Sequence, residues 1–337
     1  MSEYKTTAGT GDRIHPTTST ITFADHWGHF LARWGYRRGE HRVEPGLYGL
    51  GNPSPDSPVF VTANYTLSFD GLRSALAGFD GYILVLDTEG INVWCAAGKG
   101  TFGTDELVHR IELTGLKEIV SHRTLILPQL GAAGVSAHEV EKRSGFCIEY
   151  GPIRVADLPK YLETHEATPE MRRVTFTLRD RLVLIPVELT HVFPALVISG
   201  VGLFLLGGLL VSLAVVSAIL AGVVLFPILL PWLPTPNFST KGFILGGAVA
   251  IPFVLTAFLG HPQGAWWVKA GWVLMGILVL SSVTAFLALN FTGSTPFTSR
   301  SGVRREIFAY IPLMAVMFGT GLCMAVVFSL LRVWGGR

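Results

Sequence analysis

The chain has 337 residues, enough for two domains, and carries 26 basic and 24 acidic residues. A net charge of +2, without a basic run interleaved with aromatic residues, argues against nucleic-acid binding. The charges are distributed unevenly, because only nine of them follow Leu182 and none lies between Leu189 and Thr240. The composition therefore predicts a water-soluble half followed by a half that resides in lipid.

The first 55 residues are polar and rich in turn-forming residues, which predicts an irregular segment with one short helix at 24–34. They hold no apolar core of signal-peptide length, so we expect the soluble half to stay in the cytoplasm. The cytoplasmic location is expected for all of residues 1–182.

Residues 56–182 alternate between strand and helix patterns, which predicts an α/β head of Rossmann-like type with a parallel sheet. Strands are expected at 59–68, 81–87, 125–127 and 146–150. Helices are expected at 72–76, 105–113, 136–143 and 156–163. Ligands bind such sheets beyond the carboxyl ends of the strands, so the residues after Asp87, Leu127 and Tyr150 are site candidates.

The segment after the second predicted strand has the signals of a very short capped helix. Asn92 is a favourable N-cap and Gly98 a favourable left-handed terminator, so Cys95 is expected as the third helical residue. The positive end of the helix dipole favours a thiolate there, whereas Asp87 and Glu89 oppose it. On these residues alone, Cys95 is either such a thiolate or an ordinary buried thiol.

Other motifs near this segment are incomplete. Gly98-Lys99-Gly100 lacks the upstream glycine and the hydroxyl residue of a phosphate-binding P-loop, and no intact G-x-G-x-x-G fingerprint is present. No oxyanion signature supports a Cys–His nucleophile. Three cysteines without a CxxC pair are too few for an iron–sulfur cluster or a structural zinc, and Cys147 and Cys323 are expected to be buried and unreactive.

Residues 183–337 are dominated by apolar stretches that match membrane-spanning helices of about 20 residues. The uncharged stretch 189–240 is too long for one helix and must cross twice, with a break near Gly207-Gly208. The five expected spans are 190–207, 210–231, 241–260, 267–289 and 307–331. Tryptophans expected at span ends, as in aromatic belts, are Trp232, Trp266, Trp267 and Trp334.

Arginines set the expected orientation. The four arginines between residues 172 and 181 precede the first span and place the head on the cytoplasmic side of the cytoplasmic membrane. Five spans place the three arginines of the 290–306 loop on the same side, whereas four spans would not. The spans hold almost no ionisable residues, which favours an anchor and docking platform over a transport path.

The eight residues Asn92-Val93-Trp94-Cys95-Ala96-Ala97-Gly98-Lys99 carry a specific resemblance. They match, at every position, the cap-helix signature N-(V/I)-W-C-A-(A/G)-G-K of the HgcA family of mercury-methylating membrane corrinoid proteins. The stretch from Val59 to Leu189 also resembles the corrinoid domain of the large subunit of the corrinoid iron–sulfur protein. Segments 61–66, 127–135, 145–152 and 181–188 carry that second resemblance, which does not cover residues 1–50.

The resemblance implies a cobalamin-type corrinoid, bound base-off, with Cys95 as the catalytic residue and the lower axial ligand of cobalt. The D-x-H-x-x-G motif of histidine-ligated corrinoid proteins is not present in the sequence, which agrees with a cysteine ligand. The implied cofactor-binding residues are Thr62, Asn64, Thr66, Asn92, Val93, Trp94, Cys95, Ala96, Ala97, Gly98, Lys99, Gly100, Thr101, Gln129, Gly131, Gly134, Val135, Tyr150, Gly151 and Pro152. For Asn92 and Lys99, simple capping and solvent exposure stay open beside corrin contacts.

The implied activity is a corrinoid-dependent methyltransferase that passes a methyl group from methyl-Co(III) to Hg(II), giving methylmercury. The implied partners are a methyltetrahydrofolate-linked methyl donor and a ferredoxin-like 4Fe–4S reductant of the HgcB type. The first alternative is a membrane-tethered corrinoid methyl carrier of one-carbon metabolism, like that of the acetyl-CoA pathway. A corrinoid uptake or sensing protein is the second, and a heavy-metal permease, which would need cysteine or acidic pairs within its spans, is the third.

Overall fold

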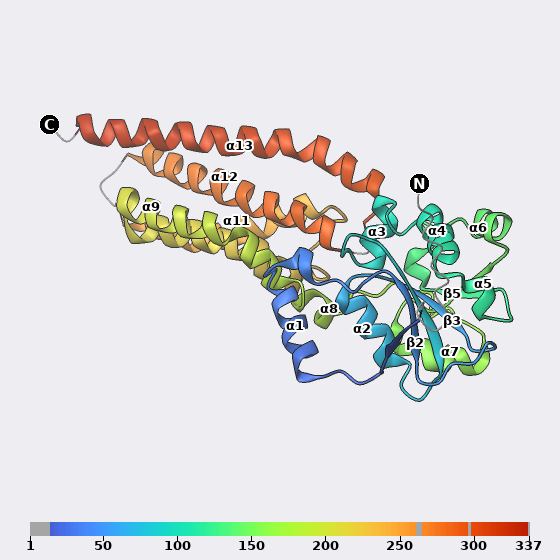
Figure 1. Ribbon diagram of the computed structural model, residues 1–337. Coiled ribbons are helices and arrows are strands. Elements are labelled where there is room, and N and C mark those ends of the chain that lie inside the picture. Colours follow the sequence, from blue (N-terminus) through green and yellow to red (C-terminus); the bar gives the residue numbers. More distant parts are fainter. Residues whose placement is uncertain (1–13, 261–264, 296–297, 336–337) are drawn as a thin grey trace, which may run out of the picture. The chain divides into compact units, whose positions relative to one another are not determined.

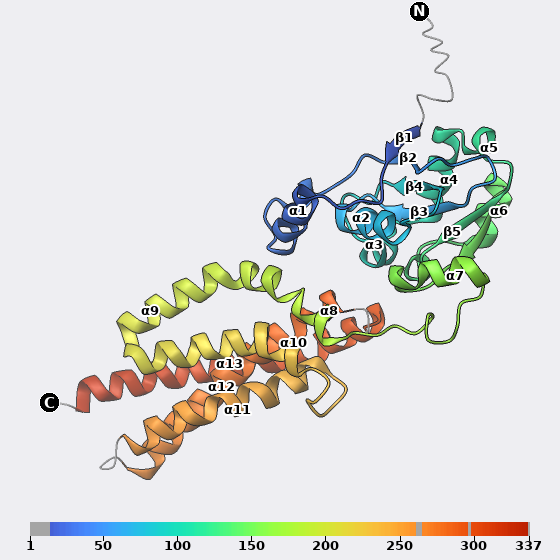
Figure 2. The ribbon, with the colours of Figure 1, turned by 90° about the horizontal axis from the view of Figure 1, so that it is seen from below.

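The computed structural model describes residues 14–260, 265–295 and 298–335. The chain divides into two compact units, a head (residues 1–175) and a helical unit (residues 176–337) (Figures 1 and 2). Sequence reasoning placed this boundary after residue 182. It falls earlier because α8 (Leu178–Leu182) belongs to the helical unit, where Arg181 donates to the backbone carbonyls of Pro227 at 2.9 Å and Ile228 at 2.7 Å.

The described part of the head contains a six-stranded sheet in the order β1-β2-β4-β3-β5-β6. The strands are β1 (Ile14–Thr17), β2 (Gly46–Leu50), β3 (Val59–Ala63), β4 (Gly81–Leu86), β5 (Thr124–Leu127) and β6 (Cys147–Tyr150). Strands β3 to β6 are mutually parallel, as predicted. The sheet as a whole is mixed, because β2 pairs antiparallel to β4 and β1 pairs parallel to β2.

The N-terminal segment is more ordered than its sequence predicts. Residues 1–55 were expected to be irregular, yet β1 and β2 join the sheet and α1 (Phe23–Arg33) forms close to the expected 24–34. The Gly-Leu-Tyr-Gly-Leu sequence of β2 is a weak strand signal, because glycine is depleted in strands. Pairing of five residues with β4, from Gly46–Val85 to Leu50–Gly81, stabilises the strand conformation that the residues of β2 do not favour by themselves.

Helices cover both faces of the sheet. One face carries α4 (Thr104–Thr114), α5 (Leu116–Ile119) and α6 (Ala137–Ser144), and the other carries α2 (Thr66–Ala75) and α7 (Leu158–Thr164). Because side chains alternate along a strand, Val59 and Val61 enter the first core and Phe60 the second. The strand predicted at 59–68 is too long, since pairing with β4 ends at Ala63 and α2 starts at Thr66.

The strand order reverses at β3. The next parallel strand along the chain, β4, lies on one side of β3, and the following one, β5, lies on the other. A reversal of this kind leaves a crevice at the carboxyl ends of the strands, where open α/β sheets bind their ligands. The fold therefore directs attention to the ends of β3 and β5.

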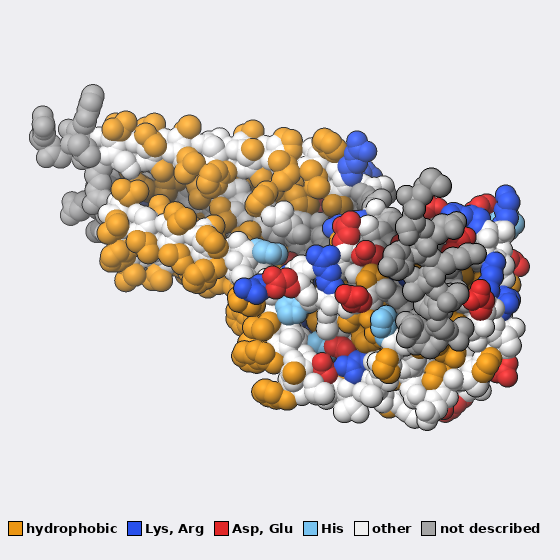
Figure 3. Space-filling model, in the orientation of Figure 1, with side chains coloured by type: hydrophobic (Ala, Val, Ile, Leu, Met, Phe, Trp, Pro, Cys, Tyr) orange, Lys and Arg blue, Asp and Glu red, His pale blue; other side chains and the backbone are white. Residues whose placement is uncertain are grey.

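Four helices in the described part of the helical unit are long and apolar enough to span a membrane, and they lie within Leu178–Leu229, Phe238–Leu259, Trp266–Ser294 and Ser301–Leu331. The first contains α9 (Ile185–Leu220), a π-helical turn (Ala221–Leu225) and α10 (Phe226–Leu229). The others contain α11 (Phe238–Leu259), α12 (Trp266–Asn290) and α13 (Arg300–Gly335). Figure 3 shows hydrophobic side chains over this unit.

The 52-residue first helix folds back on itself at the predicted position. Gly208 has a φ of 80° and a ψ of −177°, a conformation that favours glycine. Beyond it, the Ser212 hydroxyl donates to the Gly200 carbonyl at 2.7 Å. Residues twelve positions apart on a straight helix would be about 18 Å apart, so the two halves of α9 run back to back.

Polar contacts gather several segment ends of the helical unit. The Ser294 hydroxyl donates to the Glu188 carboxylate at 2.6 Å, and the Ser239 amide donates to Glu306 at 2.5 Å. These bonds join the beginning of α9 to the end of α12, and the beginning of α11 to α13. The stretch 290–306, expected to be a loop, is helical from Arg300 onward, and its described part is bound to its own unit through Ser294 and Glu306.

Candidate functional site

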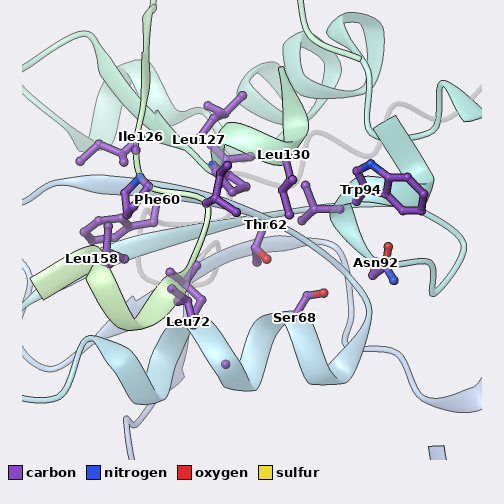
Figure 4. Close-up of a pocket in the computed structure, with 18 of the residues that line it drawn as sticks. Phe60, Thr62, Ser68, Leu72, Asn92, Trp94, Ile126, Leu127, Leu130 and Leu158 are labelled. Carbon is purple, nitrogen blue, oxygen red and sulfur yellow. The ribbon is translucent and has the colours of Figure 1, made fainter. Parts of the chain in front are cut away.

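A cavity of about 340 Å³ lies where the strand order reverses, and Figure 4 shows its walls. Asn92 and Trp94 stand at one end, and Phe60, Ile126 and Leu158 at the other. The wall is mostly apolar, with the hydroxyls of Thr62 and Ser68 between the two ends. This volume and lining are those of a small-molecule site with few polar groups.

The cavity brings together part of the predicted site. The predicted residues that line it are Thr62, Asn92, Val93, Trp94, Gly151 and Pro152. They come from three places that are distant in sequence: β3, the segment that follows β4, and the segment that follows β6. Strand ends therefore bring these six residues together at one cavity, and their contact with a cofactor stays a prediction.

The predicted cap helix is present as α3 (Val93–Lys99). The Asn92 side chain accepts a hydrogen bond from the backbone amide of Cys95 at 2.9 Å, so Asn92 is the N-cap and Cys95 the third helical residue, as predicted. The predicted terminator, Gly98, is wrong. The Gly100 amide donates to the Ala96 carbonyl at 2.8 Å, and Gly100, with a φ of 96°, ends the helix.

Cys95 is half-buried on α3 and is not among the residues that line the cavity. Burial raises the pKa of its thiol above the ordinary value, while Lys99, the Asn92 side chain and Arg38 act in the opposite direction. Of the two states that the sequence left open, the structure favours the neutral thiol, because desolvation has the largest effect on this pKa. A metal ion would reverse this, since a coordinating thiol loses its proton.

Gly131 and Gly134 brace α3 rather than line the cavity. A side chain on Gly134 would lie 2.1 Å from the carbonyl oxygen of Phe102 and 2.9 Å from the Cα of Ala97, and one on Gly131 would lie 2.6 Å from the Phe102 ring. Only glycine permits this approach of two backbones. The neighbouring Val135 is buried.

Asn64 is occupied within the protein. Its side-chain oxygen accepts from the Thr88 amide at 3.1 Å, the Thr88 hydroxyl at 2.9 Å and the Gly90 amide at 2.9 Å. Its side-chain nitrogen donates to Asp87 at 3.2 Å. Asn64 therefore fixes the loop that leads into α3, and its contact with a cofactor stays a prediction.

The other predicted residues lie around this site without lining it. The Tyr150 hydroxyl donates to the Val135 carbonyl at 2.9 Å, and Gln129 accepts from Arg172 at 2.7 Å. Among the described residues, the buried Thr101 hydroxyl has no hydrogen-bond partner. The predicted residues outside the cavity wall are Asn64, Thr66, Cys95, Ala96, Ala97, Gly98, Lys99, Gly100, Thr101, Gln129, Gly131, Gly134, Val135 and Tyr150.

Sequence reasoning missed the apolar wall of the cavity. Leu67, Ser68 and Leu72 of α2 supply much of it, and Leu158 closes the far end. The signal was available, because Ser68 and Leu72 are one helical turn apart. The strand predicted at 59–68 extends over residues 66–68 and so conceals the beginning of α2.

The other two cysteines were predicted to be buried, and this is wrong. Cys147 is exposed at the start of the edge strand β6, where its thiol donates to Glu141 at 3.4 Å. Cys323 is exposed on α13, an apolar helix that is long enough to span a membrane and need not be covered by protein.

The fold and the cavity define a class of protein: an α/β ligand-binding head joined to helices that can span a membrane. Residues 37–160 match a family model described as CO dehydrogenase/acetyl-CoA synthase delta subunit. These residues contain every residue of the cavity wall and all of α3.

The curated relatives are subunits of one complex. The acetyl-CoA decarbonylase/synthase complex subunit gamma of Archaeoglobus fulgidus is 36% identical over 124 residues, which are 36% of this chain and 26% of the relative. The subunit of the same name from Methanopyrus kandleri is 36% identical over 128 residues, 37% of this chain and 27% of the relative. The chain thus spans about a quarter of the length of these relatives.

Proposed function

We propose that the head binds a corrinoid and that the chain carries a methyl group, with Cys95 as the lower ligand of cobalt. The observation that carries the proposal is α3, which holds Cys95 beside a cavity at the strand-order reversal, inside the segment that matches the acetyl-CoA decarbonylase/synthase subunits. A bound corrinoid supplies a cobalt ion that takes a methyl group from a donor and gives it to an acceptor.

The residues of the cavity suit one part of such a cofactor. Its apolar walls and volume of about 340 Å³ fit the aromatic base of a nucleotide tail, bound away from cobalt, rather than a whole corrin. The hydroxyls of Thr62 and Ser68, which no other described residue bonds, and the Asn92 amide are available to the polar part of that tail. The buried Thr101 hydroxyl, just after α3, is a further free group.

Cys95 would serve as the metal ligand after losing its proton. Burial favours the neutral thiol, so ligation must displace a proton, and the nearby positive charges of Lys99 and Arg38 favour the resulting thiolate. A thiolate at Cys95 would donate electron density to the metal and so tune its reactivity. Asn92 and the Gly131–Gly134 turn hold α3 in place for this role.

The methyl acceptor has two candidates. The comparisons favour a partner in one-carbon metabolism, because the relatives are named as subunits of an acetyl-CoA decarbonylase/synthase complex. The segment Asn92–Lys99 favours Hg(II), because it has the cap-helix signature of the HgcA family at every position. Either activity requires protein partners, for which we propose a methyltetrahydrofolate-linked donor and a ferredoxin-like 4Fe–4S reductant.

The absorption spectrum of the purified full-length chain loaded with a corrinoid tests the proposed ligand. The wild type should show a sulfur-ligated cobalt spectrum, and Cys95→Ala should lose it while Cys147→Ala keeps it. A Cys95→Ala spectrum identical to the wild type would remove Cys95 as the ligand. Methyl transfer by the loaded chain to Hg(II), compared with transfer to a nickel-site acyl-forming partner, then separates the two acceptors.

We further propose that the chain crosses the cytoplasmic membrane five times with its head in the cytoplasm. Length and hydropathy give Leu178–Leu229 as one candidate span. The two halves of α9, which run back to back, support two crossings within it. The arginines at 172–181 support the orientation. A reporter fused at the C-terminus, after the fifth crossing, should lie outside the cytoplasm, whereas four crossings would leave it inside.

A further inference from the structure

Helix α1 presents an aromatic stripe to solvent. Phe23, Trp27, Phe30 and Trp34 are 85%, 54%, 48% and 42% exposed. At 3.6 residues per turn they fall within an arc of about 60° on the helix. Trp27 stacks on Phe30 with ring centroids 5.3 Å apart, so these rings contact one another on the surface. Figure 3 shows the resulting hydrophobic patch over α1.

The opposite face of α1 is fixed to the head. Ala32 is buried, His29 Nε2 lies 2.7 Å from the Asp70 carboxylate, and the Asp25 carboxylate accepts from Arg73 at 3.0 Å. Asp70 and Arg73 are themselves buried on α2 and lie 2.6 Å apart. The head therefore holds this helix in one orientation, with the aromatic stripe facing outward.

Basic residues border the stripe. Arg33, on its flank, is the last residue of α1, Arg37 and Arg38 follow after the helix end, and all three are exposed. Glu40 is the one acidic residue among 33–42, a stretch that also contains Arg42. An aromatic face on an amphipathic helix, with basic residues at and after its end, is typical of helices that lie in the interface of an anionic bilayer.

We propose that α1 is an interfacial helix that inserts its aromatic stripe into the headgroup region of the bilayer spanned by the chain's own apolar helices. Two observations select lipid over a protein partner. The exposed arginines match the negative charge of anionic headgroups, and the chain continues from the end of the head at Thr175 into the first membrane-length segment at Leu178. The inference does not depend on which ligand the cavity binds.

A fluorescent probe at position 30 tests this proposal in the full-length chain. Phe30→Cys, in a background whose three native cysteines are alanine, is labelled with an environment-sensitive dye and placed in nanodiscs of zwitterionic and anionic lipid. Glu139→Cys, an exposed position on α6, is the matched control. Iodide should quench the probe at position 30 at least about threefold less than the probe at 139, with a blue-shifted emission.

The medium separates lipid from protein contact. In an amphipol, which has no bilayer, the protection at position 30 should disappear. Equal quenching at both positions in nanodiscs would overturn the proposal. Protection that persists in the amphipol, or that rises with protein concentration, would identify a protein contact and would also overturn it. Hydrogen exchange of residues 23–34 in the unmutated chain, slower in nanodiscs than in amphipol, gives the same answer without a substitution.

Discussion

Removal of the Asn92 cap should release Cys95. Asn92→Ala deletes the acceptor that the Cys95 amide uses at 2.9 Å, and loss of such a cap costs about 1 kcal/mol. Helix α3 has only seven residues, so local packing and its cap hold it rather than intrinsic propensity. If a thiol reagent reaches Cys95 through local opening of α3, then 1 kcal/mol corresponds to about a fivefold faster reaction.

Alkylation kinetics in a Cys147→Ala/Cys323→Ala background, which leaves one reactive thiol, measure this effect. Asn92→Asp is the matched control, because aspartate is an equally good N-cap and should keep the wild-type rate within about twofold. An Asn92→Ala rate equal to that of the wild type would refute the reasoning, since it would mean that the cap does not govern access to Cys95.

Three further predictions follow from the same region and from the helical unit. Gly134→Ala should lower the unfolding temperature of the head, because a Cβ at 134 would lie 2.1 Å from the Phe102 carbonyl oxygen. Gly98→Ala should leave this temperature unchanged, because a Cβ at 98 would meet nothing within 4 Å. Intrinsic fluorescence during heating measures both variants. If Cys95 ligates a bound corrinoid, as we propose, ligation should strengthen by up to about tenfold per pH unit as the pH rises towards the raised pKa of the thiol and level off above it, because ligation releases the proton. A pH titration of the spectrum that stays flat would contradict this. Gly246→Leu should reduce the heat resistance of the helical unit in detergent, since a Cβ at 246 would lie 2.7 Å from the Cα of Ser281 on α12. Gly319→Leu should not, since a Cβ at 319 would enter open space. The fraction of monodisperse protein recovered after heating compares the two variants.

The parts of the fold with strong local signals were predictable. The continuous apolar run of β4, the Asn92 cap and the glycine break at 208 each follow from a few neighbouring residues. Strand β2 was not predictable, because its preference comes from pairing with β4, more than 30 residues away in sequence. The direction of the Cys95 pKa shift stayed open at the level of sequence, because the sequence shows the helix end but not the burial that raises the pKa of the thiol.

The residues of the candidate site also divide into those that the sequence predicts and those whose role depends on contacts distant in sequence. Reasoning from strand ends correctly brought Thr62, Asn92 and Gly151 to one cavity. Asn64 and Gly134 do not line that cavity, because polar and glycine residues near a site serve equally well to shape its supports. Only the three-dimensional partners of these side chains distinguish the two roles.

The charge cluster beneath α1 sets the smallest piece of the chain that can be cut out intact. The family match begins at residue 37, after α1, whereas Asp70 and Arg73 inside the match depend on Asp25 and His29 outside it. Arg73 also donates to the carbonyls of Thr18 at 2.8 Å and Thr20 at 2.6 Å. An excised fragment that starts at residue 37 would leave these charges without partners in an apolar setting. The segment shared with the relatives is therefore smaller than the unit that folds, and an expression fragment of the head should begin before β1 and extend to Thr175.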